Sequence, residues 1–351
     1  MVGGSCCLAT TVFTMPTALP PLANLFQGEE AVRMAYARIL PLENSNPVLI
    51  RILGWMLIHA PHEVGRAYVA RCINQCQDDP QIIEEARYHL QYFVKYFKAI
   101  ANKQTPTPSN DTMGARRDTI LASIDQAPTS HSQAKDRALV RDNYRCQLTG
   151  HYDDDAYSHI PAVRQESDAA PAGGIGPTEC HHILPQYVGH HIADNELRRI
   201  NAATIWSIVT AYGGIVPAQV NGAGIHNLRN IMTLRSDIHK AFDHLSIWLE
   251  PIEGLVNAYN VGRIAPRLCP DVPQVVTLTT TTPLPPPDPR YLALQAACAK
   301  VIHMSGAAES IHLILRDMED TLVLSQDGSS AGLLETLLYG QEQITMFEPS
   351  S

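Results

Sequence analysis

Charged residues are few in this chain of 351 residues, and basic residues are fewer than acidic ones. Lys and Arg number 26 against 35 Asp and Glu, so the formal net charge is −9. A uniformly basic nucleic-acid-binding surface is therefore excluded, and any contact with a polyanion must be local. No run approaches the roughly 18 apolar residues that a membrane span requires, so we expect no membrane association. The glycine signatures of dinucleotide-binding domains and Walker loops are also absent.

Paired cysteine motifs are missing as well. The eight cysteines form neither a disulfide-like framework nor a Cys-x-x-Cys pair, a pattern typical of a reducing compartment. We therefore expect an intracellular protein of the nucleus or cytoplasm. Cys146 and Cys180 invite a zinc site with His190 and His191, but the spacing is irregular. Small buried cysteines are the default interpretation.

Histidine is what the chain has in excess. Ten of its 15 histidines fall between positions 131 and 244, in the central part of the chain. The acidic surplus lies elsewhere: from residue 251 onward there are 5 basic and 11 acidic residues. The centre therefore carries the candidate chemistry, and it carries little of the net negative charge.

Composition divides the chain into five parts. The first is uncharged and interrupted by proline and threonine, which predicts an unstructured tail. The second has apolar residues at helical spacing, and the third is a polar Thr/Pro/Ser-rich linker. The fourth holds the histidines, and the last begins with a Pro/Thr-rich spacer and continues into helices. The boundaries are 1–27, 28–101, 102–134, 135–262 and 263–351.

Two segments of the central part, residues 180–185 and 230–243, combine metal-ligand side chains with regular spacing. In the second of them, Ser236 is a good N-cap, which predicts a short helix from Asp237. His239 and Asp243 then lie four residues apart on one helical face, where they can share one divalent ion. In the first, His181 and His182 are adjacent. Neighbouring side chains on a strand point to opposite sides, so one can bind metal while the other acts as a base.

These segments resemble the HNH endonuclease signature of the ββα-metal nucleases, in a variant common among predicted fungal proteins. Cys-His-His-Ile-Leu-Pro (180–185) is similar to the family's first strand, with its metal ligand, its general-base histidine and a proline. Asn230 precedes His239 by nine residues, as in the family, and Asp243 follows four later. Arg141–Gly150 is similar to the segment that precedes the first strand in the family, called the lead-in below. The chain departs from the motif in its 47 residues between His182 and Asn230, an insertion at about 186–225.

The resemblance implies a role for each matching residue. His182 is the general base that takes a proton from water, and Asn230 holds the imidazole or the hairpin in place through its amide. His181, His239 and Asp243 hold one divalent ion, either Mg²⁺, Mn²⁺ or Zn²⁺. Arginines around the site are candidate phosphate contacts: Arg229, Arg235, Arg145 and, in the lead-in, Arg141.

The predicted fold class is therefore α+β, with a central ββα-metal (HNH) unit flanked by helical N-terminal and C-terminal regions. The predicted function is metal-dependent hydrolysis of phosphodiester bonds in nucleic acid, DNA rather than RNA. The alternative is an HNH fold without turnover that binds nucleic acid or protein. The net charge of −9 favours that alternative, whereas the intact base, ligands and asparagine favour the enzyme.

Overall fold

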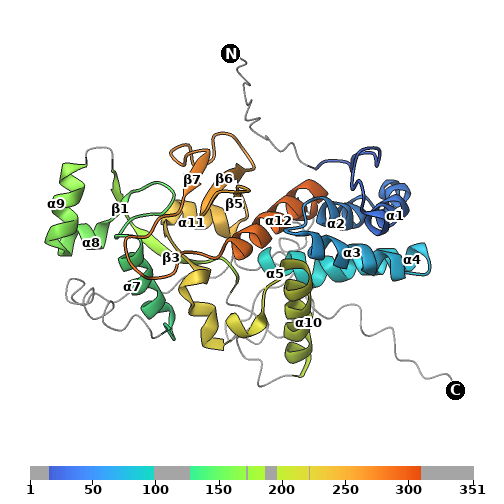
Figure 1. Ribbon diagram of the computed structural model, residues 1–351, viewed down its shortest axis with the longest axis horizontal. Coiled ribbons are helices and arrows are strands. Elements are labelled where there is room, and N and C mark those ends of the chain that lie inside the picture. The colour runs from blue at the N-terminus through green and yellow to red at the C-terminus, as the bar shows by residue number, and fades with distance from the viewer. Residues whose placement is uncertain (1–15, 99–126, 171–172, 186–195, 221, 310–351) are drawn as a thin grey trace, which may run out of the picture.

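The computed structural model describes residues 16–98, 127–170, 173–185, 196–220 and 222–309 (Figure 1). The tail before residue 16, most of the linker, His190 and His191, and the predicted C-terminal helices beyond residue 309 lie outside these ranges. The described part combines helices with three small β-sheets, so the predicted α+β class is confirmed.

The N-terminal region is helical, as its apolar periodicity predicts. Its helices begin where proline or an N-cap allows: Pro47 starts α2, and the Asp78 side chain accepts a hydrogen bond from Gln81 N at the start of α4. Phe93 and Phe97 continue the apolar face into the last turns. The elements are α1 (Glu30–Ile39), α2 (Pro47–Ile58), α3 (Glu63–Gln75), α4 (Asp79–His89), a π-helical turn η2 (Leu90–Val94) and α5 (Lys95–Lys98).

A two-stranded antiparallel sheet forms the centre of the HNH-like region. Strand β3 (Thr178–His182) pairs with β4 (Ile231–Arg235), so that His181 is opposite Met232 and His182 is opposite Ile231. Helices α7 (His131–Arg141) and α11 (Ser236–Asp243) both pack against these strands. Met232 belongs to the same apolar cluster as the α11 residues, whereas Ile231 belongs to the cluster of α7. The sheet therefore lies between the two helices.

The segment after β4 departs from the predicted cap. Helix α11 begins at Ser236 itself, with Arg235 as N-cap and no capping hydrogen bond from a side chain. The Ser236 hydroxyl instead donates to the Pro177 carbonyl, 3.4 Å away, across the start of β3. Tertiary contact with the neighbouring strand thus replaces the local cap.

Further elements surround this centre. Strand β5 (Ile247–Pro251) and strand β6 (Ala258–Arg263) form the hairpin that follows α11, and β7 (Val275–Thr277) extends it. The segment before β3 forms short strands and helices, which lie toward the left of Figure 1: β1 (Tyr152–Asp153), α8 (Asp154–His159), α9 (Pro161–Ala169) and β2 (Ile175–Gly176). The insertion between β3 and β4 contains α10 (Glu196–Gly213), followed by the 3-10 turns η6 (Pro217–Gln219), η7 (Gly222–His226) and η8 (Leu228–Asn230).

Helices α10 and α12 (Pro289–Ser305) connect the HNH-like elements to the N-terminal helices. Helix α12 packs on α2 and on β5, and α10 packs on α3 (Figure 1). The Tyr212 hydroxyl in α10 donates to the Met56 carbonyl over 3.0 Å. One apolar core therefore runs from α1 through α10 and α12 to the sheet of β5.

Two predicted boundaries change as a result, and one predicted spacer is partly buried. Residues 16–27, predicted to be unstructured, pack onto the core: Leu19 is buried, and Thr17 N donates to the Met304 carbonyl. Helix α7 begins at His131, inside the predicted linker. The Pro/Thr-rich spacer is partly buried, with Leu284 in the apolar cluster beside α7. Residues 16–27 and Leu284 pack against distant helices, whereas α7 begins at a local cap, the Ser130 side chain that accepts a hydrogen bond from Gln133 N.

The contact between α3 and α10 depends on a glycine. A Cβ atom at Gly65 would lie 2.2 Å from the Tyr212 carbonyl oxygen, which is backbone and cannot turn aside. We expect Gly65→Ala to lower the free energy of unfolding by about 1–3 kcal/mol, measured by urea denaturation. In an unhindered helix the same change would raise stability by about 1 kcal/mol. A gain of that size would contradict the close approach of the two helices.

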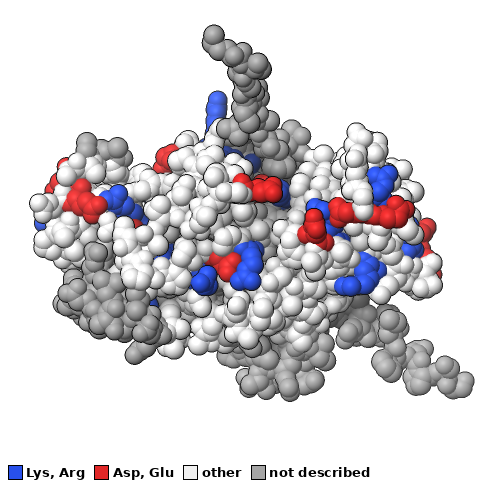
Figure 2. Space-filling view, viewed as in Figure 1, with Lys and Arg blue, Asp and Glu red and all other residues white. Residues whose placement is uncertain are grey.

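The described surface has small groups of mixed charge. On the face shown in Figure 2, basic and acidic side chains lie beside each other, separated by uncharged surface, and no continuous basic area crosses that face. Within the described ranges, no helix has the length and apolar character required to cross a membrane.

Candidate active site

Strand β3 presents different side chains to the two helices that cover it. His181 faces α11, where its ring lies 5.2 Å from that of His239 and 5.3 Å from that of Phe242, centroid to centroid. His182 faces the other way, with its ring stacked on His131 at the start of α7. The alternation expected of a strand therefore separates the two neighbouring histidines.

The three predicted metal ligands converge. One candidate ligand atom from each of His181, His239 and Asp243 lies within 4.8 Å of the others. His181 Nδ1 is 3.3 Å from Asp243 Oδ1, and His239 Nε2 is 3.3 Å from Asp243 Oδ2. The imidazoles are almost fully buried, at 1% and 6% exposed. The carboxylate is thus held between two imidazole nitrogens.

Glu179 completes this side of the strand, although no motif in the sequence marks it as a site residue. It precedes His181 by two residues, so it lies on the same strand face, and its Oε2 accepts a hydrogen bond from His239 Nδ1 at 2.5 Å. That hydrogen bond orients the ring with Nε2 toward Asp243. A carboxylate that holds a ligand histidine by its other nitrogen is common at metal sites.

The charges of this cluster call for a cation. Burial disfavours the charged form of His239, yet its hydrogen bonds with Asp243 and Glu179 raise its pKa to about 9. Burial likewise acts to raise the pKa of Asp243, but His181 and His239 hold it well below its usual range. Both ring nitrogens of His181 and Asp243 Oδ1 are buried, and beyond the 3.3 Å contact between Nδ1 and Oδ1 they make no hydrogen bond. Buried polar atoms without well-formed hydrogen bonds are costly unless a ligand such as an ion satisfies them.

The donor set therefore fits a divalent metal. Two imidazole nitrogens and one carboxylate oxygen suit a borderline ion, and the absence of a thiolate from this group leaves zinc without special preference. Among the described residues, His181, His239 and Asp243 would hold the ion, and Glu179 would orient His239.

Glu179→Gln tests this orienting role. The amide keeps the size of the side chain but loses the negative charge that fixes the tautomer of His239 and raises its basicity. We expect the dissociation constant for Mn²⁺ to rise by about 10–100-fold, measured by isothermal titration calorimetry. An unchanged affinity, in a variant with normal circular dichroism, would rule out the orienting role.

The other face of β3 holds the predicted general base. His182 Nε2 and His226 Nδ1 lie 3.2 Å apart, so that one ring donates and the other accepts. The His131 ring stacks on His182 with a centroid distance of 5.5 Å. Burial, reinforced by these two imidazoles, holds the pKa of His182 well below its usual range, which keeps the ring neutral near pH 7. His131 and His226 lie far from His182 in the sequence, and the sequence analysis assigned them no role.

Asn230 fixes the backbone that follows His182. It is fully buried, and its Oδ1 accepts a hydrogen bond from Leu184 N at 2.8 Å. Its Nδ2 donates to the Leu184 and Ile225 carbonyls, at 3.2 and 3.0 Å. Asn230 therefore holds the end of β3 and the turn before β4 rather than an imidazole ring.

We expect Asn230→Ala to lower the free energy of unfolding by about 3 kcal/mol or more, because three buried backbone groups lose their partner. Chemical denaturation measures this change. Asn227→Ala is the matched control: its side chain accepts one hydrogen bond, from Arg229 N, at a partly exposed turn, so about 1 kcal/mol is expected. Equal effects of the two substitutions would contradict the assigned role of Asn230.

The arginines proposed as phosphate contacts lie in different settings. Arg145 pairs with Glu166 and covers the ring of Tyr152, and Arg235 pairs with both Asp237 and Asp271. Arg229 is exposed, next to Asn230 in the chain.

Arg141 does not fit a phosphate contact. Its side chain is fully buried; it pairs with Asp142 and donates to the carbonyls of Leu228 and Ile231, which are 87 and 90 residues away in the sequence. It holds α7 to β4 and cannot reach a ligand in solvent.

The comparisons with known proteins agree with this architecture. Residues 146–250 match the family model of the HNH endonucleases, a range that contains β3, the insertion, β4, α11 and the start of the following hairpin. The central region belongs to the HNH endonuclease family. No curated protein and no solved structure matches the chain. The HNH match indicates a nuclease-type function in general and nucleic acid as the substrate class.

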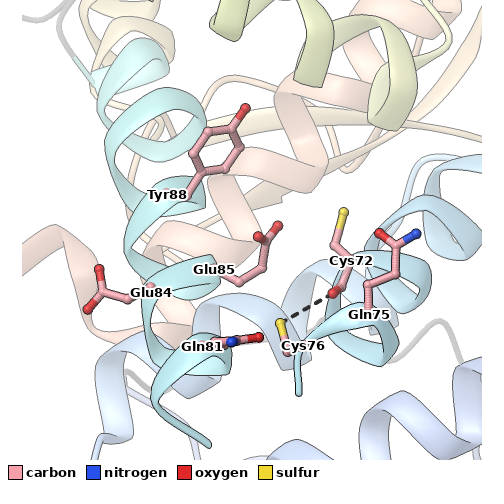
Figure 3. Close-up of a pocket in the computed structure, with 7 residues that line it drawn as sticks. All are labelled: Cys72, Gln75, Cys76, Gln81, Glu84, Glu85 and Tyr88. Carbon is pink, nitrogen blue, oxygen red and sulfur yellow. Dashed lines mark hydrogen bonds between the residues drawn. The ribbon is translucent and has the colours of Figure 1, made fainter. Parts of the chain in front are cut away.

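A cavity of about 450 Å³ lies apart from the HNH site, between α3 and α4. Figure 3 shows its lining, with Cys72 on α3 and Cys76 at its C-cap opposite Glu85 and Tyr88 on α4. Cys76 Sγ donates to the Cys72 carbonyl in the last turn of α3. None of the predicted HNH residues lines this cavity, so it belongs to the N-terminal helical region.

Proposed function

We propose that the chain is a metal-dependent HNH endonuclease that hydrolyses phosphodiester bonds of nucleic acid, DNA rather than RNA. The observation that carries the proposal is the convergence of His181, His239 and Asp243 on one face of β3, with His182 on the other. These four residues come from two segments separated by the insertion at about 186–225, yet the fold brings them to one strand and one helix.

His182 acts as the general base in this proposal. A neutral imidazole takes a proton from water as the water oxygen attacks phosphorus, and the bond from phosphorus to the leaving sugar oxygen breaks. The low pKa of His182 keeps its lone pair available, and hydrogen bonding with His226 orients the ring. The leaving oxygen takes up a proton from solvent, so charge and atoms balance.

A divalent ion held by His181, His239 and Asp243 would neutralise negative charge on the phosphate as it develops. The chain itself supplies the frame: Glu179 orients His239, and Asn230 holds the backbone after His182. In this proposal the positive charge is supplied at one point by the bound ion. A single phosphate neutralised by a metal ion requires no basic surface, so the proposal is consistent with a net charge of −9.

A plasmid-nicking assay with the full chain tests the proposal. Supercoiled DNA and a structured RNA are incubated with Mg²⁺, Mn²⁺ or Zn²⁺, or with EDTA. We expect nicked or linear plasmid with at least one ion, none with EDTA, and slower cleavage of RNA. If the chain binds the ions but cleaves neither polymer, the enzyme assignment is wrong and the fold serves as a binding module.

A further inference from the structure

The side of β3 that faces α7 carries a second group of metal-ligand side chains. Cys180 and His182 are two residues apart on the strand, so both side chains point to that side, and His131 approaches them from the start of α7. One candidate ligand atom from each of the three lies within 4.8 Å of the others. This cluster shares no residue with His181, His239 and Asp243.

The chemistry of this cluster differs from that of the first. It combines one sulfur and two imidazole nitrogens, and a third imidazole stands beside it, since His226 Nδ1 is 3.2 Å from His182 Nε2. Thiolate and imidazole together favour zinc over Mg²⁺ or Mn²⁺, whereas the carboxylate-containing first cluster does not. Cys180 is almost fully buried, but His131 and His182 are partly exposed, which gives an ion a path to the site.

We propose that His131, Cys180 and His182 form a second metal site that is selective for zinc. Tetrahedral zinc with bonds of about 2.0–2.3 Å separates its ligand atoms by roughly 3.3–3.8 Å, so ligand atoms that lie within 4.8 Å of one another need to move closer by at most about 1.5 Å on binding. The thiol proton leaves to solvent when sulfur binds the ion, and water fills the remaining position.

The second site has a consequence for catalysis that rests on the proposed function. When zinc binds His182, the lone pair that would accept the proton from water is engaged. Zinc above the amount that fills the first site therefore inhibits cleavage supported by Mn²⁺. Activation and inhibition can be separated in this way because the two sites have different ligand sets: Mn²⁺ fills the first site only, whereas zinc fills both.

Metal stoichiometry tests the second site without any activity measurement. By isothermal titration calorimetry and native mass spectrometry of the full chain, we expect His131→Ala and Cys180→Ser each to bind one zinc fewer than the wild type. Both should keep the Mn²⁺ binding of the first site, whereas Asp243→Asn should lose it. Co²⁺ provides a second readout, a thiolate-to-metal charge-transfer band that disappears in Cys180→Ser.

The double variant Cys72→Ser/Cys76→Ser is the matched control, because those thiols line the cavity in the N-terminal helices. It should keep the zinc equivalent that Cys180→Ser loses. Cys180 is buried, and its substitution can unfold the chain. If Cys180→Ser does not fold, His131→Ala tests the zinc site instead, because His131 lies in the partly exposed first turn of α7. Unchanged zinc stoichiometry in a folded His131→Ala variant overturns the site, even if the chain cleaves DNA.

Inhibition is measured as the ratio of Mn²⁺-supported rates with and without excess zinc. In the wild type we expect excess zinc to lower the rate at least about tenfold, so that the ratio is about 0.1 or less. In His131→Ala the ratio should stay near one. A second zinc that binds but leaves the wild-type ratio at one would overturn the regulatory consequence. A chain that binds two zinc ions and cleaves nothing would contradict the proposed function instead.

Discussion

His182→Ala is expected to slow phosphodiester cleavage by about 10²–10⁴-fold, the usual contribution of a positioned general base. The substitution removes the only imidazole on β3 that points away from the metal ligands, while His181 remains against α11. The rate is measured by plasmid nicking in Mn²⁺, an ion that the thiolate-containing cluster does not favour.

A loss of activity must be separated from a loss of metal or of fold. Mn²⁺ affinity in His182→Ala should stay within about twofold of the wild type, because His182 does not contact the first cluster. His159→Ala is the matched control and should leave the cleavage rate unchanged. It removes an exposed imidazole whose ring nitrogen forms a hydrogen bond with the Asp155 carbonyl of its own helix. If His182→Ala retained full activity, water would be activated by another group and the assigned base would be wrong.

Asp243→Asn is expected to raise the dissociation constant for Mn²⁺ by more than about 100-fold, above the 10–100-fold typical of residues that only orient a ligand. Asp243 supplies the only carboxylate of the cluster, and it lies 3.3 Å from a nitrogen of each histidine. Asparagine has the same size but no charge to offset the ion. The effect should therefore exceed that of Glu179→Gln, and the same calorimetric titration compares the two.

Thermal unfolding gives an independent measurement. A ligand at 100 times its dissociation constant stabilises the folded state by about 2.7 kcal/mol, so Mn²⁺ should raise the melting temperature of the wild type and not that of Asp243→Asn. Asp237→Asn is the matched control, since it alters an exposed carboxylate on the same helix that pairs with Arg235. Equal Mn²⁺ affinity in Asp243→Asn and Asp237→Asn would show that Asp243 is no ligand.

Local spacing was enough to predict which of the candidate site residues lie on the same side. His239 and Asp243 lie on one face because a helix repeats every 3.6 residues, and His181 and His182 separate because a strand alternates. Residues 146–250 form the HNH region for which these patterns argued. For Asn230 the family resemblance implied that it holds the imidazole or the hairpin, and its partners, the Leu184 and Ile225 backbone, follow only from the fold.

Local spacing could not predict the partners from distant parts of the chain. Glu179 holds His239 across 60 residues, and His131 reaches His182 because α7 covers the other side of the sheet. Nor could composition show that Leu19 and Leu284 are buried, since their neighbours are prolines and threonines. Each of these contacts depends on which apolar faces pack together.

The sequence by itself therefore determined the candidate chemistry: an excess of histidine in one central region, ligand types that suit a divalent ion, and a strand–helix spacing that puts the proposed base and the proposed ligands on different sides. Only the tertiary structure decided how β3 is used. Because α11 covers one side and α7 the other, one five-residue strand contributes His181 to the candidate metal-ligand cluster on the first side and places the proposed base, His182, beside His131, Cys180 and His226 on the second. Packing of two helices on opposite sides of one strand, rather than any local pattern, produces both.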